Sequence, residues 1–232
     1  MMDFSDILAS SIHDIKNSLG SILNTLDALI NNPDNQLADS QQVSLLQHET
    51  QRANSTLIQL LNLYKLGNAQ LTARVTKQHL GDFFEDVIAD NQALCRALAL
   101  DLTYVCDAQT TGYFDADLIH GLLNSAIGNA GRYARTKIQL SAAKTQNYLV
   151  IRLEDDGVGF PESLLQWFTS QQQPEQIMVS TGGSSDPART HLGLYFAARV
   201  AELHHTPDGR KGYIQLRNDY SLPGGCFELW LP

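Results

Sequence analysis

The N-terminal segment carries an apolar repeat that restricts how the chain can fold. Over residues 4–31, apolar side chains recur at alternating intervals of four and three residues, at Leu8, Ile12, Ile15, Leu19, Ile22, Leu26 and Leu29. This heptad spacing is typical of a helix that packs against a partner helix along its whole length. After the helix-breaking segment NNPDNQLADS, a second helix is predicted over about 41–66, with the same spacing at Leu46, Thr50, Ala53, Leu57, Leu60 and Tyr64.

Two antiparallel amphipathic helices of this length cannot bury both of their apolar faces alone. Two copies of such a hairpin can do so by forming a four-helix bundle. We therefore predict that residues 1–67, ending at Gly67, form a helical hairpin that assembles as a homodimer.

Residues 72–232 have a different pattern, in which segments with helical and strand periodicity are mixed. The expected fold class is α+β, with the helical hairpin followed by an α/β-sandwich domain over 72–232. Helices are predicted over 79–99, 115–134 and 191–205, strands over 100–106, 136–142, 148–155, 212–218 and 226–232, and a mobile Gly/Ser/Pro-rich loop over 171–190.

Composition excludes several classes of partner. The formal net charge of −9 argues against nucleic acid as the main partner. No apolar run reaches the roughly 18 residues that span a bilayer, and the N-terminus does not read as a signal peptide, so no membrane insertion is expected. Cys95, Cys106 and Cys226 form no CxxC pair, which fits reduced thiols in a cytoplasmic protein.

The segment LEDDGVGF places a carboxylate at the end of an apolar strand. Asp155 is followed by Gly157 and Gly159, which allow a sharp turn and a close approach to a ligand. A carboxylate fixed there can accept a hydrogen bond from an exocyclic amine such as that of adenine. Taken alone, however, an Asp-Gly sequence is most often a simple turn.

Two further segments have polar residues suited to phosphate chemistry. In NSAIGNAGRYA, the side-chain carbonyl of Asn129 is a suitable ligand for Mg²⁺, and Arg132 adds positive charge one turn later. In TGGSSDPARTHLGLYFA, a Gly/Ser-rich loop leads into a helix whose N-terminus can receive phosphate oxygens. Each segment also has an ordinary structural interpretation, as a polar helix face or a surface loop.

The order of the motifs is more specific than any one of them. The segments HDIKNSL, NSAIGNAGRY, DDGVGF, THLGL and GGCFELWLP follow one another along nearly the whole chain. In this order the chain resembles a two-component sensor histidine kinase with the ATP-binding fold shared by gyrase, Hsp90 and MutL. The resemblance implies that 1–67 is a dimerisation and histidine phosphotransfer domain and that 72–232 is a catalytic domain using ATP and Mg²⁺.

The resemblance gives roles to residues of the predicted helix over 115–134. Asn129 would coordinate the Mg²⁺ that bridges the ATP phosphates, and Asn124 would support the same site. Arg132 stands where the family usually has a lysine facing the phosphates. Tyr133 stands where an aromatic residue borders the nucleotide.

It also gives roles to the two glycine-rich segments. Asp155 would bind the adenine amine, with Gly157 and Gly159 shaping the pocket, and Gly193 and Leu194 would belong to the lid end beside the phosphates.

Two features depart from the family pattern. In RTHLG, Arg189 and His191 stand where the family usually has glycines, so that they either restrict the lid or, for Arg189, contact phosphate. The phenylalanine-rich box is reduced to LLQWF with Phe168.

His13 lies on the first predicted helix, on the face opposite the apolar repeat. Neutral imidazole is a competent nucleophile near pH 7, and Asp14 beside it can accept a proton or fix its tautomer. By resemblance, His13 would be the phospho-acceptor and Asp14 the base. Asn17, one helical turn further on, would orient a water that dephosphorylates the partner.

The expected function is therefore ATP-dependent autophosphorylation of His13 and transfer of the phosphoryl group to an aspartate of a response-regulator receiver domain. Two alternatives remain open: a non-enzymatic phosphotransfer or scaffold protein with a degenerate nucleotide domain, and a protein that is mainly a receiver phosphatase. Because about a dozen residues precede His13, we expect either a sensor protein that acts in trans or a kinase core trimmed from a longer protein.

Overall fold

The computed structural model describes residues 71–170 and 188–232, except for the side chains of 167–170 and 188–192. It also describes separate helical residues in the N-terminal part, at positions 15, 17, 19, 20, 22–26, 29, 46, 50, 53, 54, 56–58, 60, 61 and 64. The chain divides into two compact units, residues 1–71 and 72–232. We call them the helical unit and the catalytic unit, after the roles that the family resemblance implies for them.

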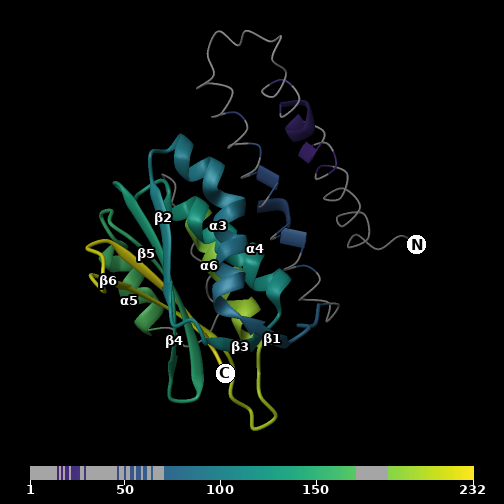
Figure 1. Ribbon diagram of the computed structural model, residues 1–232, viewed down its shortest axis with the longest axis vertical. Coiled ribbons are helices and arrows are strands. Elements are labelled where there is room, and N and C mark those ends of the chain that lie inside the picture. Colours follow the sequence, from purple (N-terminus) through teal and green to yellow (C-terminus); the bar gives the residue numbers. More distant parts are fainter. Residues whose placement is uncertain are drawn as a thin grey trace. The chain divides into compact units, whose positions relative to one another are not determined.

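The catalytic unit is built on a five-stranded sheet with the strand order β2-β4-β5-β7-β6 (Figure 1). β2 runs parallel to β4, and the other neighbouring strands are antiparallel. A separate two-stranded ribbon pairs β1 with β3. The strands are β1 (Thr76–His79), β2 (Asp101–Cys106), β3 (Thr111–Phe114), β4 (Lys137–Thr145), β5 (Tyr148–Asp155), β6 (Tyr213–Asn218) and β7 (Gly225–Leu231).

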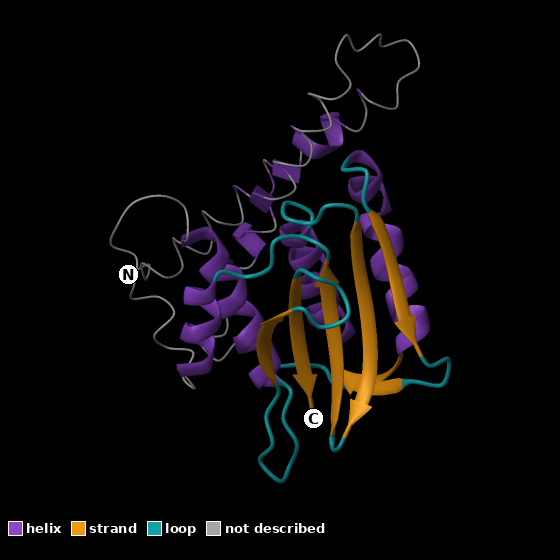
Figure 2. Ribbon diagram, turned by 90° about the vertical axis from the view of Figure 1, so that its left-hand side faces the viewer, coloured by secondary structure: helices purple, strands orange, loops and turns teal. Residues whose placement is uncertain are grey.

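Three helices form a layer on one face of this sheet. They are α3 (Leu80–Ala97), α4 (Ala116–Ala130) and α6 (Ala188–Leu203), with the shorter α5 (Glu162–Ser170) near β6. α4 lies between α3 and α6 and crosses β5, the central strand. Figure 2 shows the strands as one twisted sheet with helices behind and beside it. The unit is thus a two-layer α/β sandwich.

Alternation along β5 explains how the sheet separates two environments. Leu149, Ile151 and Leu153 are buried on one face, which we call the inner face. Asp155 lies on the same face, at the end of the strand. On the outer face, Arg152 donates a 2.7 Å hydrogen bond to Glu228 of the neighbouring β7, and both residues are buried.

The α+β fold expected for the C-terminal part is confirmed, and the predicted helices and strands correspond to α3, α4, α6 and five strands. The short strands β1 and β3 and the helix α5 were not predicted. β1 and β3 have only four residues each, too few for a clear periodicity. The loop predicted over 171–190 lies outside the described residues up to position 187. Its last three positions, 188–190, were wrongly predicted as loop, because α6 begins at Ala188.

In the helical unit, described residues are helical in both of the segments predicted as helices. Thr50 is buried and donates a 2.7 Å hydrogen bond to the carbonyl of Leu46, one turn earlier. The pairing of the two helices as a hairpin, and its assembly as a four-helix bundle, lie outside the described residues and stay predictions.

Candidate functional site

Asp155 ends β5 at the centre of the sheet, and its side chain is buried. The backbone N–H of Gly157 donates a 2.8 Å hydrogen bond to its carboxylate, and the backbone N–H of Gly225 lies nearby. Burial raises the pKa of Asp155, the two N–H groups oppose that rise, and the neighbouring Asp156 adds to it. A buried acceptor of this kind suits a ligand that presents a hydrogen-bond donor.

The next residue, Asp156, holds the connection between α4 and β4. Its carboxylate accepts hydrogen bonds from the backbone N–H groups of Arg135, Thr136 and Lys137 and a 2.6 Å bond from the Thr136 hydroxyl. Burial opposes ionisation of Asp156, but these hydrogen bonds outweigh it and lower its pKa. Asp156 therefore fixes the end of β5, and with it Asp155, against the segment that follows α4.

Gly157 and Gly159 are required by close approaches. A Cβ atom at Gly157 would overlap the carbonyl oxygen of Tyr133 and lie 2.7 Å from the Asp155 carboxylate. Gly159 has φ +76°, and a Cβ there would meet the side chain of Asn218 at 2.8 Å. The predicted role of both glycines in shaping the pocket is consistent with this packing and stays a prediction.

Asn218, at the end of β6, was not singled out from the sequence. Its amide accepts a 2.8 Å hydrogen bond from the N–H of Phe160 and donates a 2.9 Å bond to the Phe160 carbonyl. These two bonds tie the glycine-rich loop after β5 to the β6–β7 connection. Nothing in the sequence near Asn218 marks this contact, which joins residues 58 positions apart.

Asn124 and Asn129 lie on different faces of α4, because residues five apart are about 140° apart around a helix. Asn124 accepts a 2.7 Å hydrogen bond from Asn91 of α3, and its Nδ2 lies 3.3 Å from Nδ1 of His120. Asn129 is exposed in the last turn. Asn124 thus joins α4 to α3, and its part in a nucleotide site stays a prediction.

Ser125 shares the face of Asn129, since residues four apart on a helix are neighbours. Ser125 was not predicted as a site residue, although its four-residue spacing from Asn129 was available from the sequence.

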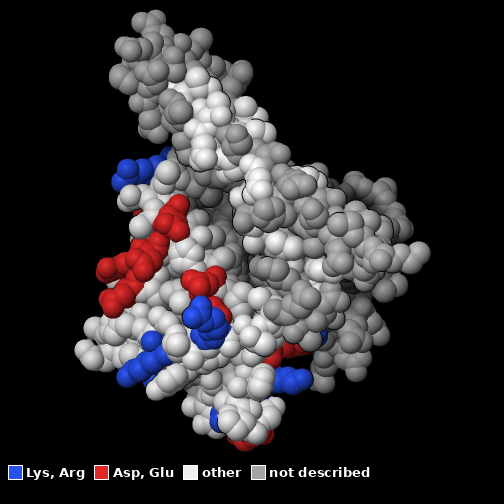
Figure 3. Space-filling model, turned by 90° about the vertical axis from the view of Figure 1, so that its right-hand side faces the viewer, with Lys and Arg blue, Asp and Glu red and all other residues white. Residues whose placement is uncertain are grey.

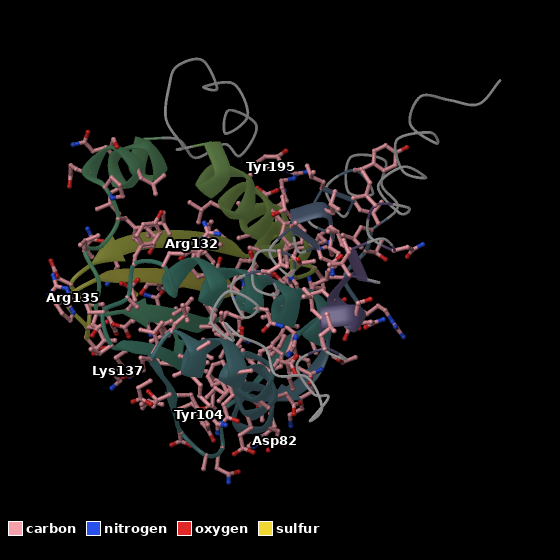
Figure 4. The ribbon with its side chains drawn as sticks, turned by 90° about the horizontal axis from the view of Figure 1, so that it is seen from above. Asp82, Tyr104, Arg132, Arg135, Lys137 and Tyr195 are labelled. Carbon is pink, nitrogen blue, oxygen red and sulfur yellow. The ribbon has the colours of Figure 1, made fainter. Side chains whose placement is uncertain are left out.

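Positive charge gathers after α4. Arg132 and Tyr133 are exposed in the turns that end the helix, Arg135 follows in the connection, and Lys137 is the first residue of β4. Figure 4 shows Arg132 and Arg135 well apart from Asp82 of α3. On the face in Figure 3, a row of acidic side chains lies along one side, with basic side chains above and below it. Basic residues thus follow α4, next to the segment that Asp156 holds, in a protein with a formal net charge of −9.

The remaining predicted site residues fall into two groups. Gly193 and Leu194 lie in α6, half-buried, within two turns of its start at Ala188. The side chains of Arg189 and His191 lie outside the described part, as do His13 and Asp14. Asn17 is described as helical and exposed.

Residues 114–232 match the family described as histidine kinase-, DNA gyrase B- and HSP90-like ATPases. The match begins at β3 and includes Asp155, Asn129 and both glycine-rich segments. Because it spans half of the chain, the chain belongs to this ATPase family, which confirms the ATP-binding fold expected from the motifs.

The curated relatives that the chain matches are sensor kinases. Sensor histidine kinase YvrG of Bacillus subtilis is 26% identical over 204 residues, covering 85% of this chain and 34% of the relative. Sensor histidine kinase CpxA of Escherichia coli is 24% identical over 197 residues, covering 84% and 40%. These relatives confirm the resemblance to two-component sensor histidine kinases. The chain spans about a third to two-fifths of their length.

Solved structures share the fold. Histidine kinase AdeS of Acinetobacter baumannii superposes with a TM-score of 0.56 at 17% identity, covering 94% of this chain and 96% of that one. Full-length ShkA in complex with AMPPNP gives a TM-score of 0.62 at 17% identity, covering 97% and 44%. Among the residues described here, no helix is both long and apolar enough to cross a membrane.

Proposed function

We propose that the chain is the core of an ATP-dependent protein-histidine kinase. The observation that carries this proposal is the buried Asp155 carboxylate at the end of β5, flanked by glycines, in a member of the ATPase family. Asp155 would accept a hydrogen bond from the adenine amine. Gly157 and Gly159 would let the base approach the backbone, and Tyr133 would border it.

The phosphates would extend toward the C-terminal end of α4. Arg132 supplies positive charge there, and the exposed side-chain carbonyl of Asn129 fits as one oxygen ligand of Mg²⁺. Gly193 and Leu194, near the start of α6, would lie at the lid end of the same site. When bound, Mg²⁺ would neutralise phosphate charge.

The phospho-acceptor would be His13. An imidazole nitrogen attacks the γ-phosphorus, the bond between that phosphorus and the bridging oxygen breaks, and ADP leaves. Asp14 takes the ring proton or fixes the tautomer. In the second transfer, a receiver aspartate attacks the same phosphorus and the phosphorus–nitrogen bond breaks, which returns His13 to its free form.

The helical unit would supply the dimer. Ile15, Ile22 and Leu29 are spaced by seven residues and are 49%, 46% and 42% exposed. Leu46, Ala53 and Leu60 repeat the same spacing in the second segment and are also exposed. Apolar positions that recur once per heptad and remain exposed in one chain fit burial against a second copy.

The test is incubation of the full chain with γ-labelled ATP and Mg²⁺. We expect an acid-labile, base-stable label that is absent from the His13→Ala variant. Label retained in His13→Ala contradicts the acceptor assignment. A chain that neither binds nucleotide nor becomes labelled contradicts the kinase and favours the scaffold protein.

A second activity, dephosphorylation of the receiver, is favoured by the exposed position of Asn17 one turn after His13. The Asn17→Ala variant should autophosphorylate normally and remove phosphate from the receiver more slowly. Equal dephosphorylation by both proteins contradicts the role of Asn17. For the input signal, we propose that a separate sensor protein acts on this chain in trans.

A further inference from the structure

The connection between β6 and β7 lies against Asp155 on both its backbone and its carboxylate. The N–H of Gly224 donates a 3.1 Å hydrogen bond to the Asp155 carbonyl, and the backbone N–H of Gly225 lies close enough to the carboxylate to lower its pKa. A Cβ atom at Gly224 would overlap the Asp155 carbonyl oxygen and lie 2.5 Å from both the Asp155 carboxylate and the nitrogen of Gly157. This connection therefore forms one wall around the carboxylate.

Glu154 holds the same connection from the other side of the sheet. It precedes Asp155 on β5 and so points to the opposite face. Its side chain is 1% exposed, and one carboxylate oxygen accepts bonds of 2.7 Å from Ser221 N, 2.8 Å from Ser221 Oγ and 3.2 Å from Leu222 N. A buried carboxylate that accepts three hydrogen bonds from one loop anchors that loop strongly.

The connection is held at a second point by Tyr220. The guanidinium carbons of Arg152 and Arg217 lie 4.7 Å and 5.4 Å from the centre of its ring. Both arginines also contact the buried Glu228 of β7. The loop thus lies on a charged cluster of the outer face, while its glycines reach round the end of β5.

We propose that Glu154 is a positioning residue for nucleotide binding. By anchoring Ser221 and Leu222, it holds Gly224 and Gly225 against Asp155 and so keeps the adenine acceptor in place. Glu154 itself does not face the nucleotide. The inference rests on the proposed function, since it concerns the acceptor of the ATP site.

The pH dependence of binding distinguishes this role from a general structural one. Asp155 accepts the adenine amine best when it is ionised, and the Gly225 N–H favours that ionised form against burial. Asp156 is the charged group of the described part that raises the pKa of Asp155. Releasing the loop would move this N–H away and so raise the pKa of Asp155. The loss of ATP binding on acidification, which we call the acid limb, should then occur at higher pH.

The experiment titrates the full chain with ATP and Mg²⁺ across pH. We expect Glu154→Ala to weaken ATP binding about tenfold and to raise the midpoint of the acid limb. Glu154→Gln retains an acceptor oxygen and should recover most of the affinity lost in Glu154→Ala. If Glu154→Ala does not fold, as judged by circular dichroism, Ser221→Ala removes one of the three bonds and should produce a smaller shift in the same direction.

Val150→Ala is the matched control, because Val150 is fully buried on the same outer face of β5 and is paired with Trp230 of β7 in the sheet. It should lower stability without changing ATP affinity or its acid limb. Unchanged ATP binding by the Glu154 or Ser221 variant, or an equal shift of the acid limb in Val150→Ala, overturns the inference about Glu154 but not the proposed function. A wild-type chain that does not bind ATP overturns the proposed function as well.

Discussion

The two units differ in how they bury their apolar side chains. In the catalytic unit, the inner face of the sheet and the facing sides of α3 and α4 are almost fully buried, with Phe84, Ile119 and Ile151 at zero exposure. In the helical unit, apolar residues at heptad spacing remain exposed, as at Ile15 and Ile22. One unit completes its core within a single chain, and the described residues of the other do not.

This difference indicates a division of tasks. A self-sufficient core keeps Asp155 and its glycines in fixed positions, as a nucleotide site needs. An exposed apolar heptad face instead depends on a partner, so its structure would change with association. Variants in one unit should therefore leave the property of the other unchanged.

The largest effect is expected for Gly157→Ala in the catalytic unit. The new Cβ atom would overlap the Tyr133 carbonyl, so the loop must shift and ATP affinity should fall about 100-fold. Calorimetric titration with ATP and Mg²⁺ measures this, and the molecular mass in solution should not change. Gly121→Ala is the control, since nothing lies near its Cβ, and it should stabilise the protein by about 0.5–1 kcal/mol. Wild-type affinity in Gly157→Ala would contradict the tight packing of this loop.

The reciprocal variant is Ile22→Asp in the helical unit. Burying a charge at a heptad position opposes association, so the mass from light scattering should fall from twice to once the chain mass of 25.6 kDa. ATP affinity should stay unchanged. Val105→Asp on β2 is the control, because Val105 is 59% exposed but lies in the catalytic unit. A monomeric wild type, or a dimer retained in Ile22→Asp, argues against this interface.

A smaller, pH-dependent effect is expected at His204, which is buried at the end of α6. Its Nδ1 lies 2.8 Å from the Val200 carbonyl and therefore donates, while Nε2 accepts a 3.0 Å bond from the N–H of Asp115. Burial lowers the pKa of His204 and outweighs the opposing effects of Val200 and Asp115. The unfolded chain then binds more protons, so stability should fall as pH drops below about 6.5.

Urea unfolding of the chain, measured at several pH values, tests this. His204→Gln can still accept the Asp115 N–H but does not titrate near neutral pH, so its stability should depend less steeply on pH between about 6.5 and 5. Equal slopes for the two proteins would show that His204 is not the group responsible.

The smallest effect is expected for Asn124→Ala. It removes the acceptor of the buried Asn91 amide, which keeps its other bond to the Val87 carbonyl, so the loss of stability should be about 1 kcal/mol. ATP affinity should change less than in Asn129→Ala, measured in the same titration. A larger loss of affinity in Asn124→Ala would give Asn124 the supporting role implied by the family resemblance.

The sequence predicted the parts of the site that depend on local order. Asp155 and its glycines follow a strand whose apolar pattern is plain, and Asn129 lies on a helix with clear periodicity. The contacts of Glu154 and Asn218 could not be predicted, because each joins segments about 60 residues apart and depends on strand pairing. The separation of Asn124 from Asn129 was available from helical geometry alone.

The most direct test of the central claim, that the Asp155 site drives phosphorylation of His13, compares three proteins. Wild type, His13→Ala and Asp155→Asn are incubated with γ-labelled ATP and Mg²⁺, and the protein-bound label that is stable to base is measured. We predict label in the wild type, none in His13→Ala and strongly reduced label in Asp155→Asn. Equal labelling of the wild type and Asp155→Asn, or label retained in His13→Ala, would contradict the account.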